Sequence, residues 1–431
     1  MLCICANFLS AAQDAEMLAT LVQKGIITAG EATEIKKASA ETSPAVEISP
    51  PVRDFNMVFY AQTRYMLVSQ KYSGLSEKYQ ESGFTIRRVI IAPSMNIGDD
   101  FHFQMSISMT SKPFITDSCS VSKIFDGEYF CGRLQGGYLC APVSMEQDES
   151  GSRLLAMERS IPSNYWGGGD WYYVNGFRNA YNSRLCLSGG HMGLMWRGEL
   201  PRDKRYKYGF GITNSQGQYI KPQKGNDLAY WLYFRYNGNV SQKLKLHTGI
   251  NGGYANKLMG IITPESIHVS ECSNYVSTIT ANPFIFVTYA DDTQLKIEFF
   301  GNVMENGKTQ KGDIPWYTTT SKRAMPVGGV ATLLHRFQTS LCTIEPVFRY
   351  SYLNTDGRGI SPSEVYYGLK TKDGLYNKSN GFYFGVNWLL NKHYAMLSTG
   401  YTYIKFSDNP VSNADKSSVA HVFAAQFQVR F

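Results

Sequence analysis

The last stretch of the chain, Val419 to Phe431 (VAHVFAAQFQVRF), has a strict period of two. One face carries Phe423, Ala425, Phe427, Val429 and Phe431, and the other carries Ala424, Gln426, Gln428 and Arg430. This alternation is typical of a strand that separates lipid from water. In a soluble sheet the phenylalanines would need a second layer to cover them, and no neighbouring segment supplies one. The stretch therefore indicates a membrane-facing strand at the end of the chain.

The composition is consistent with a barrel made of such strands. The chain has 431 residues, of which 14% are aromatic, with Tyr 29, Phe 24 and Gly 39. After the amino terminus there is no apolar run of about 18 residues, so no transmembrane helix is expected. A chain that spans a membrane without helices must do so as a closed barrel, because every backbone polar group in the lipid needs a partner.

Several other classes of protein are disfavoured. The net charge is +7, but Lys and Arg are scattered without a basic tract, so no nucleic-acid partner is expected. The eight cysteines form no CxxC pair and have no His at metal-ligand spacing, so we expect no metal and no cofactor. The sequence has no Gly-x-Ser-x-Gly elbow and no P-loop, so we expect no enzyme. The pairing of the cysteines stays open.

Alternation of the same kind recurs along the chain from Phe55 onward. Phe101, Phe103 and Met105 alternate with polar residues, and Phe382, Phe384 and Val386 do the same near the end. The sixteen expected strands cover residues 55–65, 84–93, 100–109, 115–124, 128–141, 188–198, 205–213, 228–237, 242–252, 282–291, 294–304, 326–338, 343–353, 380–390, 393–406 and 419–431. Most have the length that crosses a hydrocarbon layer when tilted.

The lengths of the connections support this interpretation. The gaps after even-numbered strands are short and include Asp126-Gly127, Asn237-Gly238 and Asp291-Asp292, whereas the gaps after odd-numbered strands are long. Outer-membrane barrels have short periplasmic turns and long external loops, while a soluble β-sandwich has no reason to alternate in this way. The sequence thus predicts an all-β fold, a 16-stranded antiparallel transmembrane β-barrel over residues 55–431.

Three segments precede the expected barrel. Residues 1–12 contain an apolar run (LCICANFL) followed by Ser10-Ala11-Ala12, which predicts a truncated signal peptide. Residues 13–39 predict a short periplasmic helical hairpin, with Thr28 and Glu31 at capping-box spacing in its second helix. Residues 40–54 contain Pro and Ser and predict a linker. The hairpin is too short to bury its apolar stripes alone and would need a partner surface.

The longest gap, Pro142 to Leu187, is the third loop. We expect a short helix around Arg153 to Glu158, followed by a turn-rich aromatic stretch near Trp166 and Trp171. A sixteen-stranded barrel leaves an aqueous lumen. The loop either folds inward and narrows that lumen or covers its outer mouth.

The polar faces of the expected strands are rich in basic residues. The residues assigned to the lumen are Arg64, Arg197, Arg205, Lys207, Arg235, Lys245, Lys296, Arg349 and Arg430, against Glu298 and Glu345. Arg87 and Arg88 are further candidates, and one of them must face inward because strand neighbours point oppositely. Basic side chains that line a narrow channel lower the barrier for anions. The pattern predicts an anion-preferring pore, with some of these residues solvated at its rims.

Several stretches resemble the phosphate-selective porin O and P family. They are GFTIRRVII, DDFHFQMSIS, SKIFDGEYFCGRLQGGYLCAPVSME and LLAMERSIP, together with the terminal AAQFQVRF. The resemblance covers most of Phe55 to Phe431 and is strongest over residues 83–162. It implies a sixteen-stranded porin, a homotrimer in the bacterial outer membrane, that passes small anions passively. It also implies that Phe427, Val429 and Phe431 form the signal for the barrel-assembly machinery.

The third loop departs from that family's pattern. Phosphate-selective members carry a lysine cluster there, whereas this loop has no lysine and places Arg153 and Arg159 among acidic neighbours. We expect these two arginines to pair with the acids, so a strong phosphate trap is not expected.

The sequence thus leads to two functional hypotheses. The first is an outer-membrane porin for small hydrophilic solutes with a preference for anions, phosphate among them, embedded in outer-membrane lipid. The alternative is a structural or adhesive protein whose barrel only anchors its loops.

Overall fold

The structure is a computed structural model. It describes residues 22–23, 28–31, 33, 52–73, 78–109, 115–128, 131–167, 173–174, 177–178, 184–185, 187–188, 191–214, 228–259, 276–306, 322–370, 376–409 and 416–431. The chain divides into two units, Met1–Val52 and Arg53–Phe431. The expected signal peptide and most of the hairpin and linker lie outside the described residues.

The capping box of the amino-terminal unit is present. The Thr28 N–H donates to Glu31 Oε2 at 2.8 Å, and the Glu31 N–H donates back to Thr28 Oγ1 at 3.2 Å. These reciprocal bonds satisfy two backbone donors that the start of a helix leaves without partners. The residues described next to Thr28 are helical, as the spacing predicts.

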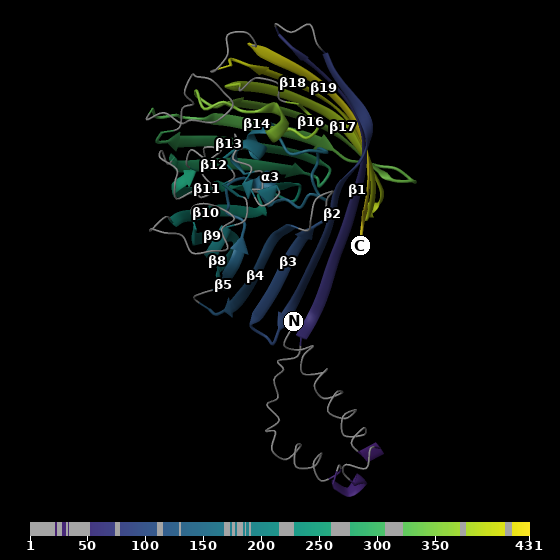
Figure 1. Ribbon diagram of the computed structural model, residues 1–431, viewed down its shortest axis with the longest axis vertical. Helices are drawn as coiled ribbons and strands as arrows, with labels where there is room; N and C mark the ends of the chain where they lie inside the picture. Colours follow the sequence, from purple (N-terminus) through teal and green to yellow (C-terminus); the bar gives the residue numbers. More distant parts are fainter. Residues whose placement is uncertain are drawn as a thin grey trace. The chain divides into compact units, whose positions relative to one another are not determined.

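The second unit is a closed antiparallel barrel of sixteen strands (Figure 1). The strands are β1 (Val52–Tyr72), β2 (Lys78–Ile97), β3 (Phe101–Ser108), β4 (Ile115–Asp126), β5 (Cys131–Leu139), β8 (His191–Leu200), β9 (Asp203–Asn214), β10 (Leu228–Asn239), β11 (Leu244–Met259), β12 (Val276–Tyr289), β13 (Thr293–Met304), β14 (Val327–His335), β16 (Thr343–Asn354), β17 (Lys378–His393), β18 (Ala395–Ser407) and β19 (Ser417–Arg430). The short β15 (Phe337–Gln338) continues β14 past Arg336 and pairs with the same neighbour, β16. A separate ribbon consists of β6 (Tyr173–Val174) and β7 (Phe177–Arg178).

The barrel closes where the two ends of the sheet meet. β19 pairs antiparallel with β1, in a register that runs from Tyr60 opposite Arg430 to Tyr72 opposite Ser418. β1 also pairs with β2, and each later strand pairs with the strands next to it in sequence. Closure gives every strand two neighbours, so no sheet edge is left open to pair with another chain. No helix of the described residues is both long and apolar enough to cross a membrane.

The terminal strand confirms the two faces expected from its sequence. Phe423, Phe427 and Phe431 are exposed on the outside, whereas Val422, Gln426 and Gln428 are buried inside. The exposed faces of the other strands are likewise apolar, with Phe210 on β9 and Phe384 on β17 about 60% exposed. An apolar exterior on a closed barrel is the surface that lipid covers.

The connections alternate as expected, with one difference. Short turns at 98–100, 201–202 and 290–292 follow the second, sixth and tenth strands, and longer segments follow their neighbours. The expectation of a long first loop over 66–83 is wrong, because β1 continues to Tyr72 and β2 already begins at Lys78. The additional residues of β1 are held from inside the barrel, since Gln70 Nε2 and the Tyr72 hydroxyl both donate to the Lys370 carbonyl, at 3.0 and 2.9 Å.

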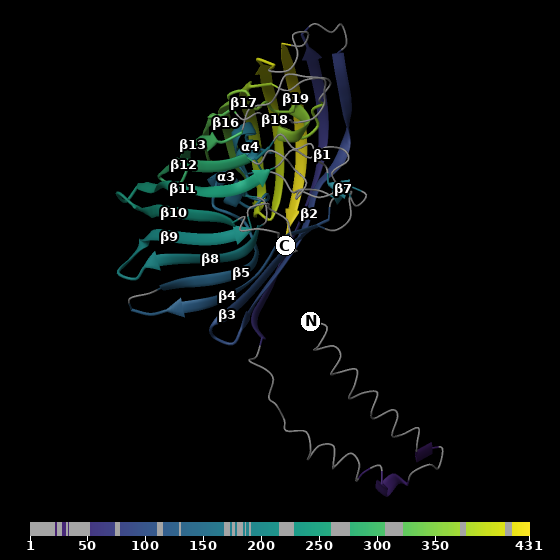
Figure 2. The same ribbon diagram turned by 60° about the vertical axis from the view of Figure 1, so that its left-hand side comes forward.

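The third loop folds into the barrel, which decides between the two expected arrangements (Figure 2). It carries two short helices, α3 (Met145–Asp148) and α4 (Ile161–Trp166). The expectation of a helix around Arg153 to Glu158 is wrong, because these residues are not helical. The helices start instead at Ser144 and Ser160, whose side chains accept from backbone N–H groups three residues later.

Candidate functional site

The third loop is held to the barrel wall by its acidic side chains, starting with Glu158. This buried carboxylate accepts from Arg64 Nη1 at 2.5 Å and from Arg87 Nε and Nη2 at 2.5 and 2.9 Å. Arg88 lies 3.8 Å from its other oxygen. Three guanidinium groups from β1 and β2 therefore surround one carboxylate of the loop. Burial of these arginines requires the counter-charge that Glu158 supplies.

The arrangement of Arg87 and Arg88 differs from strict strand alternation. Both side chains reach the interior, since Arg88 Nη1 also donates to Gln62 Oε1 at 3.2 Å. Strict alternation would have turned one of the two arginines toward the lipid, which is costly for a guanidinium group. Burial on its own would raise the pKa of Glu158, but Arg87 and Arg64 lower this pKa well below its usual value. The loop carboxylate therefore stays ionised.

Three more acidic residues of the loop meet three more basic residues of the wall. Arg349 Nη1 on β16 lies 3.0 Å from Glu146, and Arg235 Nη2 on β10 lies 2.9 Å from Asp148. Lys296 on β13 pairs with Glu149. The charges that the strand pattern assigned to an open lumen are thus partly neutralised by the loop.

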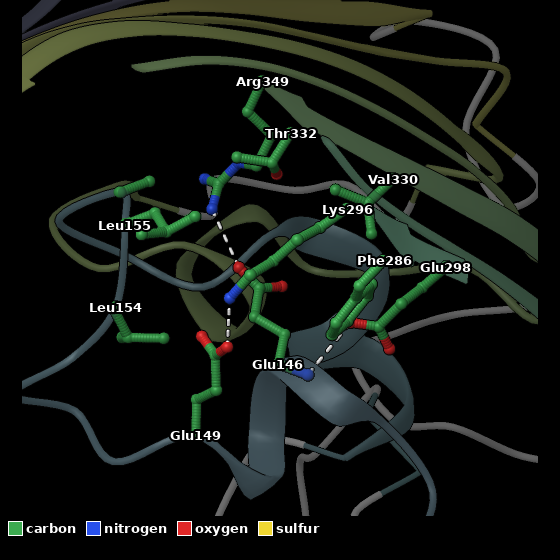
Figure 3. A pocket seen from close by; sticks show the side chains of 11 residues that line it. Glu146, Glu149, Leu154, Leu155, Phe286, Lys296, Glu298, Val330, Thr332 and Arg349 are labelled. Carbon is green, nitrogen blue, oxygen red and sulfur yellow. Dashed lines mark hydrogen bonds and ion pairs between the residues drawn. The ribbon is translucent and has the colours of Figure 1, made fainter. Parts of the chain in front are cut away.

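The seam between loop and wall is tight. Figure 3 shows Glu146 and Glu149 of the loop meeting Arg349 and Lys296 of the strands. The space enclosed there, which Thr332 also lines, is about 20 Å³. This is roughly the room that one water molecule occupies. The loop therefore narrows the lumen and leaves no wide gap on this side.

Both ends of α3 are capped by side chains from outside the helix. The Glu298 carboxylate on β13 accepts from the Met145 and Glu146 N–H groups, at 2.9 Å each. At the other end, Arg159 donates to the Glu146 and Glu149 carbonyls at 3.1 and 2.9 Å. Such partners satisfy the backbone groups that helix termini leave open.

The two arginines expected at the constriction have different positions. Arg159 binds backbone carbonyls, so the expectation that it pairs with its acidic neighbours is wrong. Arg153 is exposed, and no ion pair links it to another part of the described chain. The acids near it are taken by the wall instead, because Glu158 meets Arg64 and Arg87. Only Arg153 of the two is placed to meet a passing ion.

A second inward segment fills the lumen beside α4. Its helix α5 (Pro362–Val365) accepts a bond from Asn164 Nδ2 of α4 at the Val365 carbonyl, 2.9 Å away. Tyr165 and Trp166 of α4 are fully buried, in one apolar cluster with Val365 and Tyr366. The sequence did not indicate this segment, since its apolar residues follow no clear period. One side of the lumen is therefore packed like a protein core.

Four basic residues lie on the neighbouring strands β5, β8, β9 and β10. Arg133 on β5 lies opposite Arg197 on β8, and Lys207 on β9 lies opposite Arg235 on β10. Arg197 donates to Gln135 Oε1 at 2.7 Å and to the Cys140 carbonyl at 3.2 Å. Within the described chain, Arg133, Arg197 and Lys207 have no carboxylate partner. Among the described residues, Lys207 lies opposite Glu199 of β8 without an ion pair, and Arg133 and Arg197 have no acid opposite them on the neighbouring strands. These residues contrast with the paired residues at the loop.

Sequence reasoning found three of these four residues and missed Arg133. The stretch around it, CGRLQGGYL, is interrupted by glycines that hide the alternation. The usable signal was Leu134 between two polar residues, because a leucine that faces the lipid turns Arg133 and Gln135 inward. The structure places Leu134 on the exposed face.

The remaining basic residues lie toward the short turns. Lys245 Nζ is 2.7 Å from Asp291, and Arg205 is 2.7 Å from Asp203, with both basic side chains exposed. Arg430 is the last residue of β19. These positions are rim positions rather than constriction positions.

The residues of the expected assembly signal lie on the outer face of the closing strand. Phe427 is exposed opposite Thr63, and Val429 lies opposite Ala61. Phe431 stacks on Phe59 with ring centroids 6.0 Å apart. The residues therefore border the seam at which the barrel closes.

The described residues contain no group of His, Cys, Asp and Glu that could hold a metal ion.

Comparisons with known proteins agree on the architecture. No protein-family model matches the chain, and no curated protein matches its sequence. Among solved structures, it is similar to the anion-selective porin from Comamonas acidovorans, with a TM-score of 0.52 and 10% identity over 87% of this chain and 99% of that chain. It is also similar to the outer membrane channel DcaP of Acinetobacter baumannii, with a TM-score of 0.50 and 8% identity over 88% and 97% of the two chains. At these identities the likeness concerns the fold.

The class of protein follows from the barrel and its surface. The chain has the sixteen-stranded barrel fold of bacterial outer-membrane porins. Its closed sheet and exposed aromatic exterior are those of a barrel embedded in the bacterial outer membrane.

Proposed function

We propose that this protein is a diffusion porin that passes small hydrophilic solutes and prefers anions. The observation that supports this most directly is the group of basic residues on β5, β8 and β9, Arg133, Arg197 and Lys207. These side chains face the lumen and have no carboxylate partner within the described chain. In a narrow aqueous passage such charges attract anions and repel cations.

The loop pairs sharpen the proposal by showing which charges are available. Arg349, Lys296 and Arg235 are each matched by one acid, and they contribute little net field. Arg64, Arg87 and Arg88 share Glu158, which leaves an excess of positive charge at that cluster. Selectivity is therefore assigned to this cluster and to the basic residues on β5, β8 and β9. Phosphate selection is not part of the proposal, because no cluster of free lysines faces the lumen among the described residues.

The experiment is reconstitution of the purified protein in a planar bilayer. We expect stepwise currents. In a potassium chloride gradient, the sign of the reversal potential should show that chloride is more permeant than potassium. A cation-side reversal potential would contradict the anion preference. Absence of current steps from protein that migrates as a folded barrel on a detergent gel would contradict the channel, and the alternative of an anchored structural or adhesive barrel would then stand.

Two partners complete the proposal. The barrel-assembly machinery would recognise the seam strand through Phe427, Val429 and Phe431, which lie on its lipid face.

A homotrimer is the proposed assembly, as the family resemblance implies. Chemical crosslinking in native outer membranes should give a species of three chains, and a purely monomeric pattern would contradict it.

A further inference from the structure

A recess lies between α3 and the strand ends that carry short turns. It has a volume of about 400 Å³, within the range of about 300–1,000 Å³ typical of small-molecule sites. Its lining comes from α3 with the residue after it, and from the lumenal faces of β10 to β13, including Asn237 and Gln294. Unlike the tight seam on the other side of Lys296, this space admits a solute.

One part of the recess is apolar and aromatic. Met145, Phe286 and His247 line it, and Phe284 packs behind Met145 and Phe286 in a small buried cluster. The His247 ring stands edge-on to both phenylalanines, with centroids 5.0 and 5.7 Å away. Aromatic rings prefer such tilted and edge-to-face neighbours. This side of the recess suits an aromatic ring or a large apolar group.

The other part of the recess carries matched charges of both signs. Asp148 and Glu149 come from the loop, while Lys296 and Lys245 come from the wall. Glu149 pairs with Lys296, and Asp148 pairs with the neighbouring Arg235. Lys296 Nζ also lies 5.3 Å from the centroid of the Phe286 ring, so the charged and aromatic parts are in contact.

Matched charges discriminate between solutes by sign. A simple anion that takes Lys296 leaves Glu149 without a partner, and a simple cation that takes Glu149 leaves Lys296 without one. Leaving one partly buried charge unpaired is unfavourable. A zwitterion can take both, with its carboxylate on the lysine and its ammonium on the glutamate. Of these three kinds of solute, the zwitterion is the one that keeps both charges of the Glu149–Lys296 pair matched.

We propose that this recess is a subsite for zwitterionic solutes with an aromatic or large apolar side chain, the chemistry of an aromatic amino acid. The inference rests on the proposed function, because the recess lies in the lumen of the channel. It adds a substrate class that the anion preference alone does not provide. Chloride is attracted by the basic residues on β5, β8 and β9, whereas the zwitterion is held beside α3.

The test compares three solutes that share a phenylethyl skeleton and differ in the charged groups it carries at pH 7: L-phenylalanine with both groups, 3-phenylpropionate with the carboxylate alone and phenethylamine with the ammonium alone. Each is titrated onto single channels that carry chloride current. L-phenylalanine should block at concentrations about tenfold lower than the other two, a difference typical of one lost charge pair. Glycine should block weakly, because it lacks the ring. Equal or better block by 3-phenylpropionate would overturn the proposal.

Substitutions at the charge pair should reverse the preference in opposite directions. Glu149→Gln frees Lys296 and should favour 3-phenylpropionate over L-phenylalanine, whereas Lys296→Gln frees Glu149 and should favour phenethylamine. Phe286→Leu should weaken L-phenylalanine toward the level of glycine. Lys405→Gln, on an exposed residue of β18, should change none of these values. A merely structural role for the pair would weaken all three solutes alike.

A second measurement separates failure of the subsite from failure of the channel. Isothermal titration of the folded barrel in detergent reads binding of the same three solutes without any current. If current steps are absent but calorimetry gives the same order, the channel proposal fails and the subsite stands. If chloride steps are present and neither method prefers L-phenylalanine, the subsite is overturned and the channel stands.

Discussion

The Glu298 carboxylate on the barrel wall caps the helix that begins at Met145 in the third loop. It accepts the Met145 N–H at 2.9 Å, and the Ser144 hydroxyl donates to it at 3.1 Å. Glu146 in turn accepts the Ser160 N–H at 3.0 Å, at the start of α4. The wall therefore holds one helix, and that helix holds the next. The constriction is fixed by buried hydrogen bonds rather than by loose contact.

Removing the wall carboxylate should loosen the constriction. Glu298→Ala leaves the N–H groups of Met145 and Glu146 without their acceptor, which costs about 1–3 kcal/mol of stability. We expect a lower midpoint of heat-modifiable migration on detergent gels and noisier single-channel current. The control is Glu305→Gln, whose pair with Arg323 is exposed and should contribute less than about 1 kcal/mol. Equal effects of the two substitutions would argue against the capping role.

Neutralising the acid at the arginine cluster should have a larger effect. Glu158→Gln leaves Arg64, Arg87 and Arg88 buried together without a counter-charge, a change that typically costs about 3–5 kcal/mol. The heat-denaturation midpoint in detergent measures the loss. Glu81→Gln, whose pair with Lys370 is exposed, serves as the matched control and should leave the midpoint within error. A stable Glu158→Gln barrel would show that the loop is held by its other contacts.

The same carboxylate predicts how stability depends on pH. Burial alone would raise its pKa, but Arg87 and Arg64 lower the pKa of Glu158 well below its usual value. Its contribution is therefore fully present above the unfolded value of about 4.3 and is lost as pH falls through the lower folded value. We expect a flat midpoint from pH 7 to about 5 and a fall below about 4. Glu158→Gln should remove part of that acid dependence, and a wild-type transition near pH 6 would contradict it.

Removal of basic charges on β5 and β8 should reduce anion selectivity. Arg133→Gln and Arg197→Gln each delete a lumenal cation that has no carboxylate partner in the described chain. The chloride-to-potassium permeability ratio should fall roughly twofold for each substitution, because the field in the passage weakens. Reversal potentials in a salt gradient measure the ratio. Lys405→Gln is the control, and a shift as large in that variant would exclude a local effect.

Deleting the last residue should impair assembly. Phe431 exchanges backbone hydrogen bonds with Phe59, at 2.8 and 3.2 Å, and its ring stacks on that of Phe59. Without these contacts the two strands that close the barrel lose the end of their seam. We expect the truncated chain to be secreted but to accumulate outside the outer-membrane fraction, without heat-modifiable migration. Phe210→Ala, on an exposed aromatic of β9 away from the seam, should assemble normally. Normal assembly of the truncated chain would refute the role of Phe431.

The sequence by itself determined the barrel. Residues two apart on a strand share a face, so the alternation in Val419–Phe431 and in earlier strands assigns the lipid side and the lumenal side without further information. The alternation of short and long connections then implies an up-and-down order of strands. The first loop was overestimated because the upper half of β1 alternates less regularly beyond Tyr65, where it is held by the segment ending at Lys370.

Only the tertiary structure decided what the lumenal charges do. Glu146 meets Arg349, and Glu158 meets Arg64, although each pair is far apart in sequence. Nothing local indicates such a pair, because a loop has no period that would orient its side chains. Which cations remain open to a permeating anion depends on where the loop lies. Strand periodicity therefore gives the direction of the lumenal side chains apart from neighbours such as Arg87 and Arg88, and the packing of the loop against the wall gives their partners.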